Sequence, residues 1–201
     1  MARIDDYIQA RSLSIKELEG KDIESIAGLS GAAMNRDGDG HLYALSLRFL
    51  NRDVIISWPG MKFSYKDAGD EVPLQQQVLL LHYLVGAGDS HEEKAGGEWI
   101  SFQDLPEGRF YMDSFIKRAK EPLLRAFGSD TKKMAELAVR IYNASPMEFG
   151  DFSVVVRALP MVPVVLVLWQ GDDEFPPEGN ILFDSNISGI LPVEDIALLA
   201  G

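Results

Sequence analysis

The chain has 201 residues, a formal net charge of −12, 46% hydrophobic residues and no cysteine. These proportions are ordinary for a globular protein and exclude a disordered, collagen-like or coiled-coil chain. The missing cysteines exclude disulfides, thiolate zinc, cysteine-ligated Fe–S clusters and a cysteine nucleophile, and the negative charge opposes binding to nucleic-acid phosphates.

Residues 4–11 and 22–29 have patterns typical of helices, with Asp22 as the N-cap of the second helix and Gly28 and Gly31 closing it. The stretches 41–50, 54–58 and 61–65 follow, with alternating apolar residues and tight turns between them. This pattern predicts an antiparallel meander of three short strands.

The middle of the chain has a helical period. Residues 73–88 predict a core-facing helix that ends in two glycines. A second helix is expected over 109–127, where Pro122 should kink or break it, and a third begins near residue 130. We therefore expect three amphipathic helices here.

The last third begins with two strand patterns, at 152–159 and 162–169. The second is apolar on both faces, so we expect it to be central in its sheet. A short extended segment at 180–184 and a helix opening near Pro192 complete the chain. The expected architecture is an α+β single domain over residues 1–201, with an N-terminal antiparallel meander and C-terminal strands packed with the central helices.

Membrane association is not expected from this pattern. The longest uncharged apolar stretch, Ala158 to Trp169, is well short of the ~20 residues of a membrane span and contains two prolines. The first eleven residues carry charges and include no apolar leader segment. A cytoplasmic location is the expectation.

Charge is distributed unevenly along the chain. Residues 158–201 hold seven acidic residues and no lysine, arginine or histidine, whereas residues 109–140 hold eight basic residues against four acidic ones. We expect these two regions to face each other or water.

The stretch WQGDDEFPPEGNILFD, at 169–184, places Asp172, Asp173 and Glu174 in a turn directly after a buried strand, with Glu178 and Asp184 further on. Their oxygens could converge on a hard cation if segment 180–184 returns beside strand 162–169. Glycine, aspartate and proline also suit turns for backbone reasons alone, and we expect a structural turn. The candidate residues for ligand or cation binding are Asp172, Asp173, Glu174 and Asp184, and no catalytic residue or metal ligand is assigned.

Within this stretch, GDDEF is similar to the GGDEF signature of diguanylate cyclases, and GDD to the polymerase turn. Both sites need a further carboxylate on a neighbouring strand and groups that bind phosphates. Pro176 and Pro177 interrupt the second strand, and no glycine-rich phosphate loop is present. We therefore reject both interpretations.

The remaining motifs also favour structural roles. NRDGDGH at 35–41 imitates the start of an EF-hand loop, but position 12 is Ser46 and a strand follows, so a solvated turn is expected. His82 lies in an apolar helix and is interpreted as a hydrogen-bonded residue at the edge of the core. The segment around His91 is interpreted as an exposed loop.

Several motifs in order along nearly the whole chain resemble a family known as domain of unknown function 3786: SGA (30–32), WPG (58–60), LLLHYL (79–84), GEWISFQDLPEGRFYMDSF (97–115), ALPMVPVVLVLWQGDDEFPPEGNILFD (158–184) and LPVEDIALL (191–199). The resemblance implies a setting in anaerobic bacteria and archaea. Some relatives carry a cysteine-rich Fe–S module or lie near one-carbon and corrinoid metabolism. It transfers no catalytic residue, and the cysteine-free chain departs from those relatives.

Three functions are open at this point, and one of them is a purely structural interaction protein that docks a basic partner through its acidic face. The leading expectation is a cytoplasmic binding or accessory module, linked to anaerobic one-carbon or Fe–S metabolism through a partner and needing no cofactor of its own. Its partner is an unknown protein or small molecule, with no nucleic acid and no membrane. The alternative is a metal-dependent or acid/base enzyme that uses the acidic turn 172–184.

Overall fold

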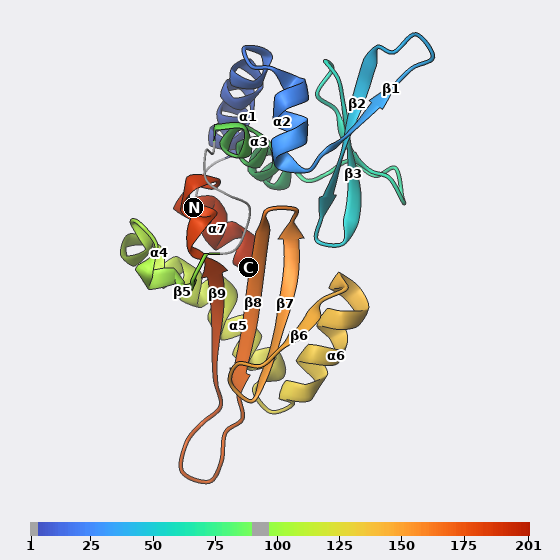
Figure 1. Ribbon diagram of the computed structural model, residues 1–201. Helices are drawn as coiled ribbons and strands as arrows, with labels where there is room; N and C mark the ends of the chain where they lie inside the picture. The colour runs from blue at the N-terminus through green and yellow to red at the C-terminus, as the bar shows by residue number, and fades with distance from the viewer. Residues whose placement is uncertain (1–3, 90–96) are drawn as a thin grey trace. The chain divides into compact units, whose positions relative to one another are not determined.

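The computed structural model describes residues 4–89 and 97–201, and its contacts divide the chain into two compact units. Unit 1 comprises residues 1–92 together with 159–161 and 189–191, and unit 2 comprises the rest. Each unit has its own antiparallel sheet and its own helices (Figure 1). The expected α+β class is confirmed, while the expectation of a single domain stays a prediction.

The sheet of unit 1 has four strands in the order of the sequence: β1 (Ala33–Arg36), β2 (Leu42–Phe49), β3 (Arg52–Ser57) and β4 (Phe63–Tyr65). All neighbours are antiparallel, so the predicted meander is confirmed. Sequence analysis missed β1 because this edge strand is mostly exposed and has no alternation of apolar and polar residues.

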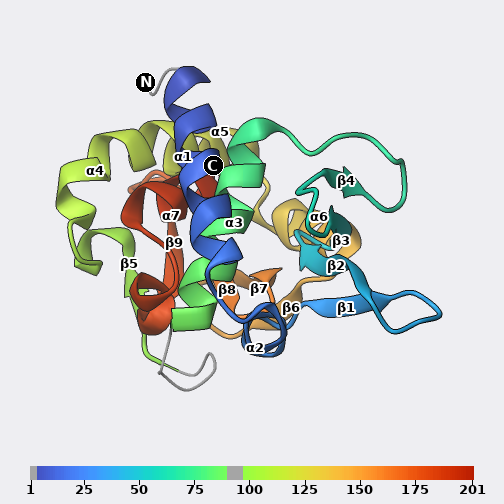
Figure 2. The ribbon, with the colours of Figure 1, turned by 90° about the horizontal axis from the view of Figure 1, so that it is seen from above.

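Three helices belong to unit 1: α1 (Ile4–Glu19), α2 (Ile23–Ser30) and α3 (Leu74–Asp89). Both α1 and α2 pack on α3, and Figure 2 shows α1 running beside it. The predicted caps at Asp22 and Gly31 are confirmed, because Asp22 accepts a hydrogen bond from the backbone N–H of Glu24 and Gly31 is left-handed. Gly28, which was also expected to close the helix, lies inside it. Helix α1 continues beyond its predicted end at residue 11.

Helix α3 contains Gly86 and Gly88 in its last turn and ends at Asp89, one residue beyond the predicted range 73–88. A β-carbon on Gly86 would lie 2.0 Å from the carbonyl oxygen of Ile190, and one on Gly88 would lie 2.8 Å from the side chain of Ile26. These glycines therefore let neighbouring segments of the chain approach α3 closely.

Tyr83 lies one turn earlier in α3. Its hydroxyl donates to the Ser30 carbonyl at 2.7 Å and accepts from the Met161 backbone N–H at 3.2 Å. Burial raises the pKa of Tyr83 well above its ordinary value.

Unit 2 contains a five-stranded sheet with β8 in the middle, as the sequence predicts. Its strands, in spatial order, are β5 (Trp99–Ser101), β9 (Glu178–Asp184), β8 (Val162–Trp169), β7 (Phe152–Leu159) and β6 (Ser145–Met147). The two edge strands, β5 and β6, were not predicted because each has only three residues, too few to show a period.

The helix expected over 109–127 is continuous but irregular. It consists of α4 (Gly108–Phe115), a π-helical segment (Ile116–Lys120) and α5 (Glu121–Phe127). Pro122 has no N–H, and its ring crowds the carbonyl four residues earlier, that of Arg118. Because Arg118 lies in the π-helical segment, the wider turn accommodates the proline without breaking the helix.

One face of β9 packs on this helix through three fully buried aromatic rings. Phe102 and Phe115 stack with their centroids 4.3 Å apart, and Phe183 of β9 meets both edge-on at about 6 Å. Phe102 belongs to a short 3₁₀ helix (Phe102–Asp104). The opposite face of the sheet has a second cluster, around Val165, Val167 and Leu182.

Two further helices complete unit 2: α6 (Thr131–Tyr142), which begins near residue 130 as predicted and is capped by Asp130, and α7 (Val193–Ala200). A second 3₁₀ helix (Ser185–Gly189) follows β9. Helix α7 packs against α4 and the π-helical segment, which brings part of the acidic C-terminal region beside part of the basic one. No helix in the described ranges has the length and apolar character that crossing a bilayer requires.

The glycines of unit 1 give a matched pair of substitutions. We expect Gly86→Ala to lower the free energy of unfolding by about 1–3 kcal/mol, because the new methyl group would displace the backbone of Ile190. Gly28→Ala, in α2, should raise it by about 0.5–1 kcal/mol, since nothing lies within 4 Å of the new β-carbon. Urea unfolding followed by circular dichroism measures both. Equal effects of the two substitutions would contradict the close approach.

The Tyr83 hydroxyl gives a second prediction. Tyr83→Phe leaves a buried carbonyl and a buried N–H without this partner, so we expect a loss of about 1–3 kcal/mol in unfolding free energy. Tyr43→Phe is the control, because Tyr43 is exposed on β2 and should change stability by less than about 0.5 kcal/mol. A loss no larger in Tyr83→Phe than in the control would refute the assigned role.

Candidate functional site

The acidic turn lies in the connection between β8 and β9. The Asp172 carboxylate accepts hydrogen bonds from the backbone N–H groups of Glu174 and Phe175 at 2.9 and 2.8 Å, and the Asp172 N–H donates to the Phe175 carbonyl. The backbone donors of Phe175 and Glu174 lower the pKa of Asp172 below its ordinary value. Asp172 therefore folds the turn with its own side chain, and it is exposed along with Asp173 and Glu174.

Asp184, the fourth candidate, lies at the other end of β9. Register pairs Trp169 with Glu178 at the turn and Val164 with Phe183 near Asp184, so segment 178–184 does return beside β8. However, β9 has seven residues, and at roughly 3.3 Å per residue its ends are ~20 Å apart. The strand pairing that could have brought the carboxylates together instead separates Asp184 from the other three.

Asp184 is buried, with 4% of its surface exposed, and its carboxylate accepts from the backbone N–H groups of Gly97 and Asn186 at 3.1 and 3.0 Å. A β-carbon on Gly97 would lie 2.7 Å from this carboxylate. The Ser185 N–H also donates to the Glu98 carbonyl. These contacts give Asp184 a role in joining β9 to the start of β5.

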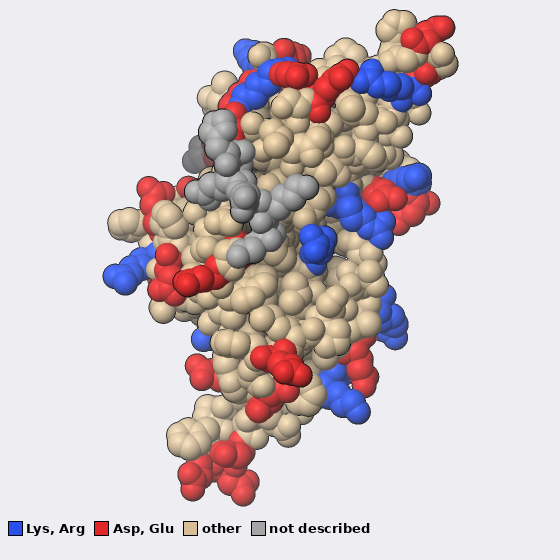
Figure 3. All heavy atoms as spheres, in the orientation of Figure 1, with Lys and Arg blue, Asp and Glu red and all other residues tan. Residues whose placement is uncertain are grey.

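The acidic turn is prominent on the surface. Figure 3 shows acidic side chains gathered at the tip of the β8–β9 connection, at the lower end of the hairpin. The described residues of this tip include no lysine or arginine, because residues 158–201 contain none. The turn therefore projects from the surface and carries a local negative charge. The expectation that it is a structural turn, with no cation bound, stays a prediction.

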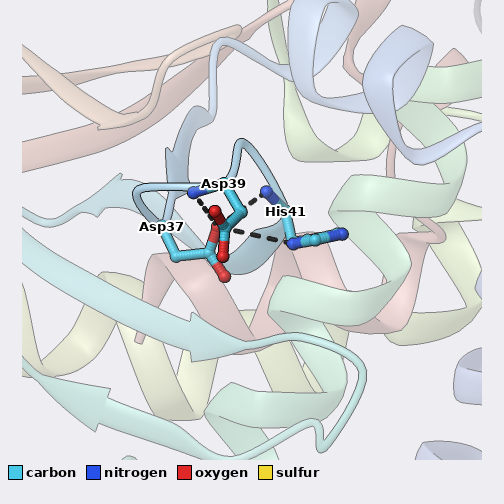
Figure 4. Close-up of side chains that lie close together, drawn as sticks. All are labelled: Asp37, Asp39 and His41. Carbon is cyan, nitrogen blue, oxygen red and sulfur yellow. Dashed lines mark hydrogen bonds and ion pairs between the residues drawn. The ribbon is translucent and has the colours of Figure 1, made fainter.

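A second acidic group lies in the β1–β2 turn, where the sequence imitates an EF-hand. Asp37, Asp39 and His41 each offer a ligand atom, and these atoms lie within 4.8 Å of one another (Figure 4). One oxygen of Asp37 already accepts from the N–H groups of Asp39 and His41, at 3.0 and 2.9 Å. All three residues are exposed. The expected solvated turn is thus observed, and its carboxylate stabilises the turn backbone.

The two other histidines contribute no cluster among the described residues. His82 is half-buried in α3, at the edge of the core as expected. His91 and the loop predicted around it lie outside the described residues.

The structure adds a cleft in unit 1 that no sequence motif marks. We call it the unit 1 cleft; its volume is about 600 Å³, and it lies between one side of α1 and the start of α3. It is lined by Ile8, Arg11, Ser12, Glu71, Val72, Pro73, Leu74 and Gln77. Its wall therefore combines apolar side chains with one cation, one carboxylate and one amide.

Arg11 is the cation of the unit 1 cleft, and its guanidinium is held from several directions. Nε donates to the side-chain oxygen of Gln77 at 2.7 Å, and Nη2 donates to the Met61 carbonyl. The guanidinium also lies over the Phe63 ring, 5.7 Å from its centroid. These partners come from α3, from the loop before β4 and from β4 itself, so the fold fixes the orientation of Arg11.

Gln77 links the two charged residues of the unit 1 cleft. Only 4% of its surface is exposed, and its amide nitrogen donates to the Val72 carbonyl at 2.7 Å and to Glu71 at 3.2 Å. Its amide oxygen accepts from Arg11. The amide is therefore satisfied on both sides, which fixes its rotamer and the position of the guanidinium.

A second cleft, of about 560 Å³, lies in unit 2 between α6 and strands β6 and β7. Its lining is Lys132, Ala135, Glu136, Val139, Pro146, Met147, Asp151, Phe152, Ser153 and Val154. Val139 is 44% exposed, and the hydroxyl of Ser153 donates to the Met147 carbonyl. This cleft is more apolar than the first, and of its charged side chains the Asp151 carboxylate accepts a hydrogen bond from the Gln170 backbone N–H at 2.8 Å.

A family model described as "Domain of unknown function (DUF3786)" matches residues 22–201, and the chain therefore belongs to this family. No curated protein and no solved structure matches the chain. The match begins at Asp22, so helix α1, which supplies Arg11, precedes the matched residues. The unit 1 cleft thus combines a segment outside the match with α3, which lies inside it.

The acidic turn generates a prediction about pH. Because backbone N–H groups donate to the ionised Asp172 carboxyl, its pKa should lie below the ordinary value of 3.8. These bonds are present above the ordinary pKa and are lost as the pH falls through the lowered one. Carboxyl carbon NMR between about pH 2 and 6 measures the midpoint, with Asp172→Asn identifying the signal.

The amide signals of Glu174 and Phe175 should shift with the same midpoint, because their N–H groups lose this acceptor when Asp172 is protonated. A midpoint above 3.8 would instead indicate carboxylates that crowd one another, as in an empty cation site.

Proposed function

We propose that this DUF3786 chain is a binding or accessory module and that the unit 1 cleft is its ligand site. The observation that carries the proposal is the fixed Arg11 guanidinium in the cleft wall, held by Gln77, Met61 and Phe63. Binding sites are typically concave, largely apolar and provided with a few preorganised polar groups, and the unit 1 cleft has this composition.

The arrangement favours binding because the polar side chains in the cleft hold one another in place. Preorganised side chains lose little conformational entropy when a ligand arrives, which leaves more of the contact energy for affinity. The Met61 backbone also has a positive φ of 49°. Such a conformation is uncommon for a residue other than glycine, and it is found where surrounding contacts determine the backbone.

The setting of this module is part of the same proposal. The family resemblance supports a role in anaerobic one-carbon or Fe–S metabolism, exercised through a partner, and the expected location is the cytoplasm. The net charge of −12 supports a partner other than nucleic acid, because phosphate contacts require basic side chains.

The enzyme alternative rests on the acidic turn 172–184. It would gain support if several carboxylates converged, since hard cations take several oxygen ligands. The structure separates Asp184 from Asp172 along β9, and the Asp172 carboxylate is engaged by two backbone N–H groups. For these reasons we place the binding module first.

The proposal is tested by blocking the unit 1 cleft. Ser12 is an exposed cleft residue on α1, and Ser12→Trp should fill the cleft without disturbing the core. Leu13→Trp is the matched control, because Leu13 is the next residue, is 58% exposed and does not line the cleft. Both variants and the unsubstituted chain are screened by thermal denaturation against a defined library of carboxylic acids, amino acids, sugars and nucleosides.

We expect at least one compound to raise the melting temperature of the unsubstituted chain and of Leu13→Trp but not of Ser12→Trp. If every stabilising compound raised the melting temperature of all three proteins equally, this result would contradict the assigned site. Proton NMR of the same mixtures should recover each bound compound unchanged, and its conversion would favour an enzyme.

A further inference from the structure

Arg11 has binding capacity that its neighbours do not use. A guanidinium has five N–H donors in a planar fork. The bonds to Gln77 and Met61 use one donor on Nε and one on Nη2. Both donors of Nη1 and one of Nη2 are therefore available to a ligand in the cleft that Arg11 lines.

Arg11 also forms no direct ion pair with another described residue, although the Glu71 carboxylate lines the same cleft. Its hydrogen-bond acceptors are an amide and a backbone carbonyl, both neutral, and its ring contact is with phenylalanine. The ion pairs of the described residues involve other basic side chains, namely Lys21, Arg36, His41, Arg48 and Arg52. An anionic ligand would supply the opposite charge.

Glu71 limits how negative that ligand can be. Its carboxylate lines the same cleft and accepts from the Gln77 amide nitrogen, while the Gln77 amide oxygen accepts from Arg11. The Gln77 amide therefore links the carboxylate to the guanidinium. A doubly charged phosphate would be repelled by Glu71 and by the net charge of −12, whereas a carboxylate carries a single charge that the guanidinium fork can bind through two parallel bonds.

The rest of the cleft wall indicates what the carboxylate is attached to. Ile8, Pro73 and Leu74 supply an apolar surface beside Arg11. Ile8 is 51% exposed, so a ligand can cover part of it and gain hydrophobic contact. A short aliphatic chain suits this surface.

From these contacts we propose that the unit 1 cleft binds small aliphatic monocarboxylates, with the carboxylate on the free N–H groups of Arg11 and the chain on the apolar wall. This inference rests on the proposed function and specifies its ligand class. Gln77 is a positioning residue here, because it holds the guanidinium and does not touch the ligand.

The test uses hexanoate as the probe and hexanamide as its neutral isostere, with amide NMR titrations of the full chain. Hexanoate should shift the signals of cleft residues, and hexanamide should bind at least tenfold more weakly because it lacks the charge. Inorganic phosphate is the third probe and should bind more weakly than hexanoate. Tighter binding of phosphate would overturn the choice of a monocarboxylate.

Two substitutions should change the affinity for hexanoate in opposite directions. Arg11→Gln should weaken hexanoate binding about tenfold to a hundredfold, the value of a lost charge-assisted bond. Glu71→Gln should tighten it by a few fold, because it removes a repelling charge while its amide oxygen can still accept from Gln77. Glu71 is exposed, so this variant remains informative if Arg11→Gln does not fold. Arg48→Gln, on β2, is the control and should leave the affinity unchanged.

The outcomes separate this inference from the proposed function. Hexanoate that binds equally to the unsubstituted chain, Arg11→Gln and Glu71→Gln would overturn the carboxylate assignment. If neutral compounds bind and Ser12→Trp still blocks them, the cleft remains the ligand site with a different ligand class. Hexanoate binding that Ser12→Trp does not affect would overturn both.

Discussion

The carbonyl oxygen of Ile190 lies where the β-carbon of any residue other than glycine at position 86 would be. This contact determines how closely the segment around Ile190 packs on α3. Gly88 permits a similar approach by Ile26. The Tyr83 hydroxyl forms hydrogen bonds with both Ser30 and Met161. The same helix carries Gln77, which holds Arg11. The packing of unit 1 and the geometry of its cleft therefore depend on one helix.

Elements with a long and regular apolar pattern could be predicted from the sequence. Strands β7 and β8 have the predicted bounds, and the central place of β8 follows from its two apolar faces. Edge strands such as β1 and β6 could not be predicted, because partners across the sheet stabilise them more than their own residues do. The two glycines of α3 do lie at its end, as predicted, but the sequence did not show that neighbouring residues pack closely against them, because a glycine required by such packing looks the same in sequence.

The candidate site was harder to predict. A run of acidic residues suggests a cation site in a sequence. In the structure, however, the Asp172 carboxylate accepts hydrogen bonds within its own turn, and the Asp184 carboxylate accepts one from Gly97, just before β5. Arg11 and its partners form no motif, because Met61 and Gln77 are 50 and 66 residues away along the chain. One signal was available: glutamine at position 77 lies on the apolar stripe of a core helix, where a polar residue needs partners.

Unit 1 is not a continuous piece of sequence, since it takes in residues 159–161 and 189–191 from the last third of the chain. An expression fragment that stops after α3 would lack Met161, a partner of the Tyr83 hydroxyl, and the Ile190 backbone against which Gly86 packs. Such a truncation would expose an apolar helix surface and leave a buried hydroxyl with one partner fewer. Dissection of this protein into halves at the boundary near residue 92 would therefore remove part of the structure it aims to isolate.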